Sequence, residues 1–152
     1  MKLNRTHVFP FTINFDLLDA GKALHHPNYL VVFERARAAA LRLAGYSDME
    51  LWKAGYALTV AHIESQFLKP VLLGENVTVL TRLIEAGAAT MAVHQSMIPL
   101  SEEHKESFVE SYSVKREFLI HECSIKLCCV NLEKMRPRRF PQELVRALEL
   151  EL

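Results

Sequence analysis

The sequence of 152 residues has few cysteines, few glycines and no long apolar run. Its cysteines, Cys123, Cys128 and Cys129, are odd in number and crowded into one segment, which excludes the disulfide framework of a small secreted protein. The five glycines are scattered and form no phosphate-binding loop, so neither nucleotide hydrolysis nor a bound cofactor is expected. No stretch reaches the roughly 18 apolar residues needed to span a bilayer, and no targeting segment is visible, so the expected location is cytoplasmic.

The chain also lacks net charge, because 18 basic and 18 acidic residues cancel. No overall field therefore attracts it to nucleic acid or to an anionic membrane surface. Half of the residues are hydrophobic, which is enough to fill one core at this length. We interpret residues 1–152 as a single domain.

One long helix is expected near the N-terminus. Alternating apolar residues predict a strand over residues 8–15, and helical spacing after a loop at 16–27 predicts a helix over about 28–43. Pro27 fits the first turn of this helix and Gly45 fits its end. The expected buried stripe is Tyr29, Phe33, Ala36, Ala40 and Leu43. The arginines expected on a solvated or interface face are Arg35, Arg37 and Arg42.

Four consecutive strands are expected after a short second helix, which a capping box of Ser47 and Glu50 begins. Their expected ranges are 56–67, 76–85, 88–98 and 118–131. The polar stretch 101–110 is interpreted as a helical or mobile excursion, and residues 141–152 as a short C-terminal helix. One long helix beside consecutive strands is an α+β layout, with an antiparallel sheet of about five strands wrapped round that helix.

The stretch FDLLDAGKALHHPNYLVVFERAR, residues 15–37, resembles the 4-hydroxybenzoyl-CoA thioesterase family, in particular its short-chain, Tol-Pal-associated branch. The parts that carry the resemblance are Asp19, Gly21, His25-His26, Pro27-Asn28-Tyr29, and Glu34 with Arg37. Supporting matches are Phe67-Leu68-Lys69-Pro70, Gly74-Glu75 and Arg136-Pro137. The resemblance implies the hot-dog fold and acyl-CoA thioesterase activity in a homodimer or homotetramer. Leu17, Lys22 and the long excursion before residue 118 depart from the family pattern and bear on substrate choice.

Thioester hydrolysis needs a nucleophile or a base, and a donor for the carbonyl oxygen. Asp19 precedes His26 by seven residues, so one loop can aim its carboxylate at the partly positive start of the helix. The resemblance implies that Asp19 attacks the thioester or activates water, and that the backbone N–H at His26 polarises the carbonyl. Taken alone, Asp19 is more typical of a turn or a helix cap, and the whole motif is what favours catalysis.

The remaining site candidates surround this motif or carry positive charge. The substrate-binding set is Gly21, His25, Pro27, Asn28, Tyr29, Glu34, Lys69, Arg82, Arg136 and Arg138. Guanidinium groups bind phosphates well, so the arginines are candidates for coenzyme A, although a solvated role is the alternative. Glu34 is alternatively one half of a structural ion pair. No side chains at ligand spacing accompany His25-His26, so no metal is expected, and the cysteines are interpreted as small buried hydrophobes.

Other functions stay open at this point. The substrate is an acyl-CoA or a thioester of acyl carrier protein. A hydratase or dehydratase of the same fold would use His26 and Glu34 as its catalytic pair. A non-catalytic protein would bind an acyl thioester without cleaving it.

Overall fold

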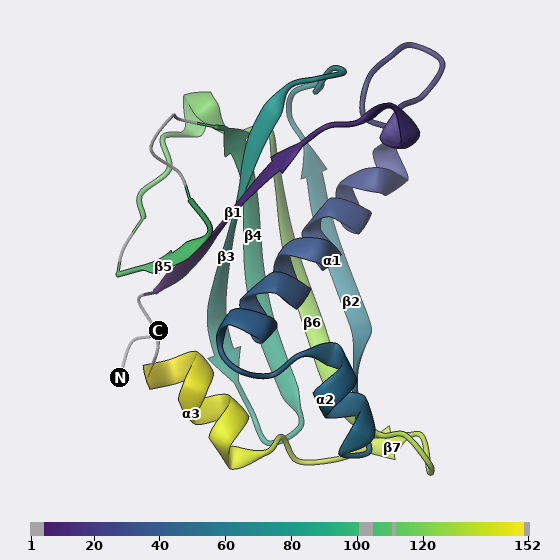
Figure 1. Cartoon of the computed structure of the whole chain (residues 1–152), viewed down its shortest axis with the longest axis vertical. Helices are drawn as coiled ribbons and strands as arrows, with labels where there is room; N and C mark the ends of the chain where they lie inside the picture. Colours follow the sequence, from purple (N-terminus) through teal and green to yellow (C-terminus); the bar gives the residue numbers. More distant parts are fainter. Residues whose placement is uncertain (1–4, 101–104, 111, 151–152) are drawn as a thin grey trace.

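The computed structural model describes residues 5–100, 105–110 and 112–150, and within them seven strands form one antiparallel sheet. Helix α1 (His26–Leu43) crosses one face of this sheet (Figure 1). The strand order is β2-β6-β4-β3-β1-β5, with β7 beside β6. The strands are β1 (Thr6–Thr12), β2 (Tyr56–Phe67), β3 (Asn76–Ala86), β4 (Thr90–Pro99), β5 (Ser107–Val109), β6 (His121–Asn131) and β7 (Arg136–Pro137). The other helices are α2 (Asp48–Lys53), α3 (Gln142–Leu150) and the single turns η1 (Phe15–Leu17) and η2 (Arg116–Phe118).

The α+β layout is confirmed, but the expectation of about five strands was wrong. The two strands that were missed, β5 and β7, have three and two residues, too few to show an alternating pattern. The described part of the predicted excursion is not helical, because Ser107–Val109 pairs with β1. Residues 101–104 of that excursion, and residues 151–152 of the predicted C-terminal helix, lie outside the described residues. No helix in the described ranges is long and apolar enough to cross a membrane.

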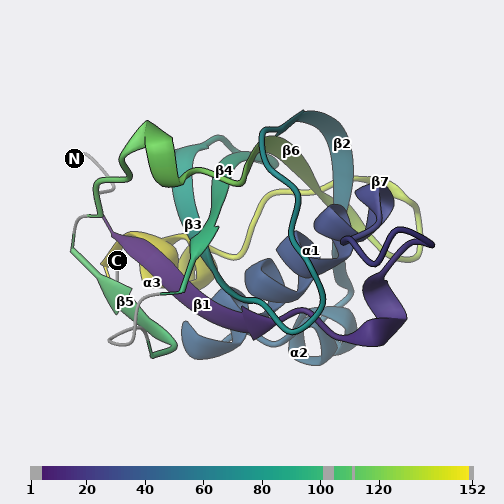
Figure 2. The ribbon, with the colours of Figure 1, turned by 90° about the horizontal axis from the view of Figure 1, so that it is seen from above.

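Helix α1 lies in the concave side of the curved sheet, as the view from above shows (Figure 2). Pro27 occupies its first turn as expected, and Gly45 follows its end with a φ of 91°, a conformation that glycine adopts without strain. The expected burial of Leu43 was wrong, since 46% of the surface of this residue is exposed. The last turn instead buries Leu41 and Ala44 in the core that also contains Leu51 of α2.

Side chains of strand β6 alternate between a buried face and a more exposed face of the sheet. Ile125, Leu127 and Cys129 are buried, whereas Lys126 is exposed, as the alternation predicts. All three cysteines are free thiols, and burial raises the pKa of Cys123 and of Cys129. Both of these buried cysteines therefore act as small apolar side chains, as interpreted from the sequence.

Candidate functional site

The loop between β1 and α1 is tied to the first turn of α1 (Figure 1). The carbonyl of Leu17 accepts two hydrogen bonds, from the His25 backbone N–H at 3.0 Å and from the Asn28 side-chain amide at 2.9 Å. Leu18 and Leu24 form an isolated antiparallel bridge just inside these contacts. The loop therefore folds back on itself at the start of the helix, with Asp19 near its tip.

Asp19 is exposed, and one of its two carboxylate oxygens holds the loop. Its Oδ1 accepts hydrogen bonds from the backbone N–H of Gly21 at 2.8 Å and of Ala23 at 3.2 Å. A Cβ at position 21 would lie 3.2 Å from this oxygen, so glycine permits the close approach. The second oxygen, Oδ2, has no hydrogen bond within the described part of the chain. Asp19 thus forms the turn through one oxygen and leaves the other available for chemistry.

The backbone N–H of His26 lies at the start of α1, which follows this loop. His26 is the first helical residue, so its N–H has no acceptor inside the helix, and none is found elsewhere among the described residues. The rings of His25 and His26 are exposed and meet edge to face at 4.7 Å. A polar group placed at the His26 N–H would experience the positive end of the helix dipole.

Tyr29 fixes the inner side of the first helical turn. It is buried, and its hydroxyl donates to the carbonyl of Lys69 at 3.3 Å. Burial raises the pKa of Tyr29, and the negative charge of Asp19 raises it further, whereas a hydrogen bond with the Val71 backbone lowers it. The carboxylate of Asp19 therefore lies within electrostatic reach of the first turn.

His121 is a buried residue behind this turn that the sequence analysis missed. Its ring stacks on Tyr29 at 4.6 Å and meets Phe67 edge to face at 4.4 Å. Its Nε2 lies 2.5 Å from the Ser65 hydroxyl, and burial lowers its pKa to about 4. The alternation of β6, extended back from Ile125 by two steps, places this position on the buried face.

The buried His121 makes the folded state sensitive to acid. The unfolded chain binds a proton at this side chain below about pH 6.5, whereas the folded protein does so only near pH 4. The stabilisation is complete above pH 6.5 and is lost as the pH falls towards 4, by about 2 kcal/mol between pH 7 and pH 5. Urea unfolding at these two pH values should show that His121→Phe removes this component. The exposed His25→Phe is the matched control, and an unchanged pH dependence in His121→Phe would contradict the assignment.

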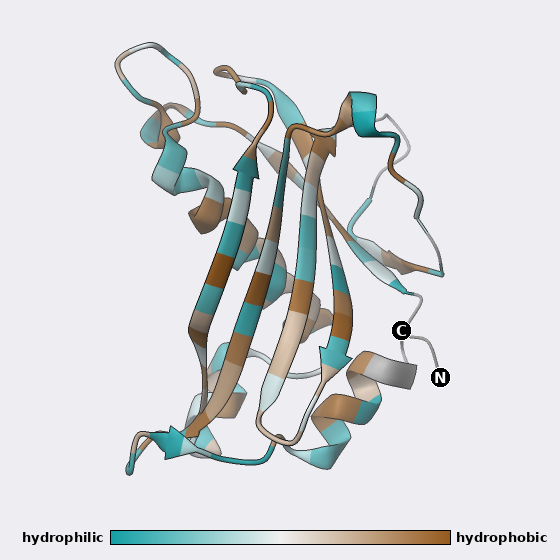
Figure 3. Ribbon diagram, turned by 180° about the vertical axis from the view of Figure 1, so that it is seen from behind, coloured by the Kyte–Doolittle hydropathy of each residue, from teal (hydrophilic) through white to brown (hydrophobic). Residues whose placement is uncertain are grey.

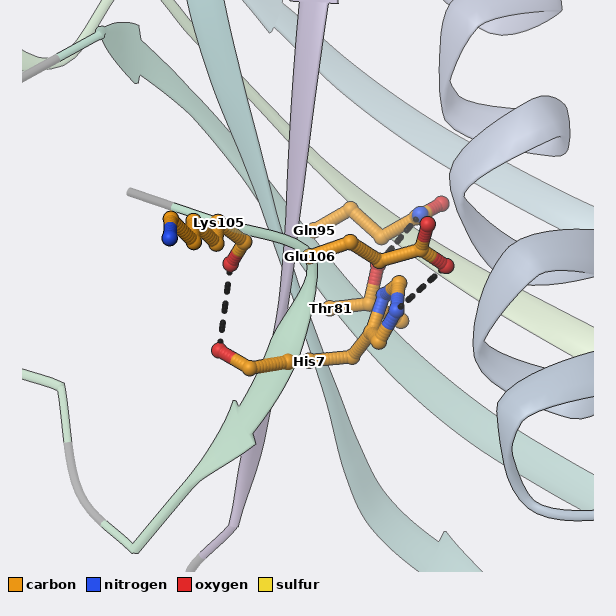
Figure 4. Close-up of polar contacts among 6 residues, drawn as sticks. His7, Thr81, Gln95, Lys105 and Glu106 are labelled. Atoms are coloured by element: carbon orange, nitrogen blue, oxygen red, sulfur yellow. Dashed lines mark hydrogen bonds and ion pairs between the residues drawn. The ribbon is translucent and has the colours of Figure 1, made fainter. Parts of the chain in front are cut away.

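A polar network crosses the core beneath the middle of α1. Gln95 is fully buried and donates to the Phe33 carbonyl and the Thr81 hydroxyl, both at 2.9 Å, and it accepts from Arg37 at 2.8 Å. Arg37 is half-buried and hydrogen-bonded to Gln95, so the expected solvated position is wrong for this arginine. Figure 4 shows Gln95 and Thr81 beside His7, whose Nε2 lies 3.6 Å from Glu106.

An open groove of about 500 Å³ lies between α1, α2 and β2. Glu34 and Arg37 line its polar part, and no ion pair from Glu34 is found among the described residues. Its apolar walls include Leu41, Met49, Trp52, Leu58, Val60 and Leu127. Arg37, Leu41, Leu58 and Leu127 also line a small apolar cavity deeper in the core, so the groove leads towards the interior.

The structure does not gather the four cationic candidates at one place in a single chain. Lys69 lies beside Tyr29, and its ammonium donates to the Glu117 carbonyl. Arg136 is in β7 and Arg138 follows it directly. Strand β7 lies at the opposite end of α1 from the Asp19 loop (Figure 1). The Arg138 guanidinium lies 3.9 Å from the ring centre of Tyr56. Arg82 lines a cavity with His94 and Ser96, on the sheet face away from α1.

Comparison with known proteins gives one family model and several relatives. A model of the thioesterase superfamily matches residues 21–103. The chain is 26% identical over 137 residues to the acyl-CoA thioesterase YbgC of Haemophilus influenzae, with 90% of this chain and 89% of that protein covered. A 1,4-dihydroxy-2-naphthoyl-CoA thioesterase from Synechocystis superposes with a TM-score of 0.79 at 16% identity, covering 97% of this chain and 98% of that one. The protein SAV2348 from Staphylococcus aureus, solved in complex with CoA, has a TM-score of 0.77 at 15% identity, with coverage of 94% and 81%. These two structures share the fold of this chain.

Proposed function

The chain belongs to the thioesterase superfamily, and we propose that it is an acyl-CoA thioesterase in which Asp19 is the nucleophile or general base. The observation that carries the proposal is the loop that holds Asp19 by one oxygen and is itself tied to the start of α1, where the His26 N–H has no partner among the described residues. The relative named as an acyl-CoA thioesterase supports the choice of substrate class. A thioester of acyl carrier protein is the alternative substrate.

Two routes through Asp19 fit this arrangement. In one, Oδ2 takes a proton from water while the water oxygen attacks the thioester carbon. In the other, Oδ2 attacks that carbon itself, and water then hydrolyses the mixed anhydride. In both routes the His26 N–H stabilises the oxyanion and the C–S bond breaks. In the first route the proton that Oδ2 took from water passes to the sulfur of coenzyme A. In the second route coenzyme A leaves as the thiolate and gains its proton when water hydrolyses the anhydride.

The groove along α1 is the proposed place for the acyl group. It runs beside the helix whose first turn carries the proposed oxyanion donor, and its walls are mainly apolar. Its volume falls within the range of about 300–1,000 Å³ typical of small-molecule sites. Arg37, Leu41, Leu58 and Leu127 line both the groove and the deeper cavity, so the length of an acceptable acyl chain depends on these four side chains.

We propose a homodimer formed through β2, with a homotetramer as the larger alternative. Strand β2 is the edge of the sheet, and most of its 12 residues are exposed. Apolar side chains on this edge are exposed by 48% at Val60, 36% at Ile63 and 54% at Phe67. A long apolar edge strand requires cover, and pairing with the β2 of a second copy would supply it.

Antiparallel pairing of two β2 strands would also complete the site. In one chain, β2 begins at Tyr56, against Arg138, and ends at Phe67, 6.5 Å from the His26 ring. A two-fold axis would place the first end of one copy beside the second end of the other. Arg136 and Arg138 of one copy would then approach the Asp19 loop of its partner, where Lys69 also lies. This arrangement supports their proposed role in binding coenzyme A phosphates.

The proposal is tested by measuring thiol release from a panel of aliphatic and aromatic acyl-CoAs with purified protein. We expect steady release of free coenzyme A with a clear preference for some acyl groups. Tight acyl-CoA binding without release would instead indicate a non-catalytic binding protein. Hydration of an enoyl-CoA would indicate the hydratase, although no described contact joins His26 to Glu34.

A further inference from the structure

The segment from β5 to β6 builds a second small core on the sheet face away from α1. After β5 pairs with β1, residues 112–119 return across this face. Figure 3 views the sheet from this side, where hydrophobic and hydrophilic bands alternate along the strands. The buried residues of this core are Val8, Leu80, Ile98 and Leu119, and Val109, Tyr112 and Val114 pack against them. The long excursion thus forms structure that the proposed reaction does not use.

A cavity of about 500 Å³ lies beside this second core. Its floor is apolar, formed by Leu80, Val114 and Leu119. Its polar wall consists of Thr6, Arg82, His94, Ser96, Tyr112, Ser113, Arg116 and Glu122. Thr81 and Gln95, the neighbours of Arg82 and Ser96, point instead into the core under α1, so the sheet separates this cavity from the groove.

The charges on the wall favour an anion. The guanidinium groups of Arg82 and Arg116 make no ion pair or hydrogen bond within the described part of the chain. Glu122 is the acidic wall residue, and it lies 3.7 Å from His94. Burial lowers the pKa of His94, the charge of Arg82 lowers it further, and Glu122 opposes both effects. Arg82 and Arg116 therefore outweigh Glu122 at neutral pH.

We propose that this cavity binds a small organic anion, whose carboxylate or phosphate pairs with Arg82 and Arg116 while its apolar part lies on Leu80, Val114 and Leu119. Planar guanidinium groups bind both kinds of anion through paired hydrogen bonds. A fatty acid and a nucleotide phosphate share this chemistry. This site goes beyond the proposed function, because it lies across the sheet from Asp19 and needs no hydrolysis to be occupied.

Calorimetric titration of the full-length protein with sodium octanoate and, separately, with adenosine 3′,5′-bisphosphate tests the proposal. We expect Arg82→Gln and Arg116→Gln each to weaken binding about tenfold or more, as loss of a charge-assisted hydrogen bond does. Glu122→Gln should tighten binding, because it removes a repulsive charge. Arg139→Gln is the matched control, since this exposed arginine does not line the cavity, and its affinity should match the wild type.

NMR titrations with the same two ligands locate the binding site, and the comparison of the two ligands identifies the source of the anion. Amide NMR shifts should change at Ser96 and Ser113, and should do so equally in Asp19→Asn. Binding of octanoate alone indicates a carboxylic acid, and binding of the bisphosphate alone indicates a nucleotide. Absence of binding at millimolar concentration, or an unchanged affinity in Arg82→Gln/Arg116→Gln, would overturn the proposal. Neither result depends on whether the protein cleaves thioesters.

Discussion

Replacing Asp19 by asparagine is expected to lower kcat/KM for the preferred acyl-CoA by about 10²–10⁴-fold, the usual contribution of a positioned acid or base. The amide oxygen of asparagine can still accept from Gly21 and Ala23, so the loop should keep its shape. The amide nitrogen that replaces Oδ2 neither accepts a proton nor attacks a carbonyl. The defect should therefore appear in kcat, while KM changes little.

Asp16→Asn is the matched control for this experiment. Asp16 is an exposed carboxylate three residues earlier, in η1, and makes no hydrogen bond or ion pair through its side chain among the described residues. Asp16→Asn should retain the full activity of the wild type. Its melting temperature should equal that of Asp19→Asn. Equal activity of wild type and Asp19→Asn would remove Asp19 from the mechanism and leave the His26 N–H without a catalytic partner.

Local sequence patterns were sufficient to predict the long elements. The capping box at α2 forms as expected, with Ser47 Oγ accepting from the Glu50 N–H at 3.2 Å and a Glu50 carboxylate oxygen accepting from the Ser47 N–H at 2.7 Å. Strand β2 has the bounds that were predicted for it. These features depend on neighbours a few residues apart, which a sequence displays directly.

Features that depend on register between distant strands were not predictable. Ser65 contacts His121 because of the register between β2 and β6, which pairs Ser65 with Cys123 and Phe67 with His121. A shift of this register by one residue would turn the two side chains to opposite faces of the sheet. Strand β5 exists because β1 offers it an edge, since its sequence Ser107–Val109 has no pattern of its own. The Asp19 loop lies between these cases: its motif is local, but its pairing with Val71 and Leu72 depends on the fold.

Placing a carboxylate on the exposed edge strand, as in Val60→Asp, is expected to separate the proposed dimer. The side chain of Val60 faces the groove beside α1 and would lie at the centre of the paired β2 strands. A buried and unpaired carboxylate costs several kcal/mol, so the dissociation constant should rise by about 10²–10³-fold or more. Light scattering at micromolar concentration should show a dimer for the wild type and a monomer for the variant.

Ile84→Asp is the control for this variant. Ile84 is 52% exposed, close to the 48% of Val60, but it belongs to β3, which β6 and β4 separate from the β2 edge. It should leave the dimer and its activity intact, whereas monomeric Val60→Asp should lose thioesterase activity for two reasons. Arg136 and Arg138 of the second copy no longer reach the Asp19 loop, and the new carboxylate lies in the wall of the proposed acyl groove. A wild-type monomer with full activity would show that one chain holds the whole site, and the phosphate-binding role of both arginines would then fail with the dimer.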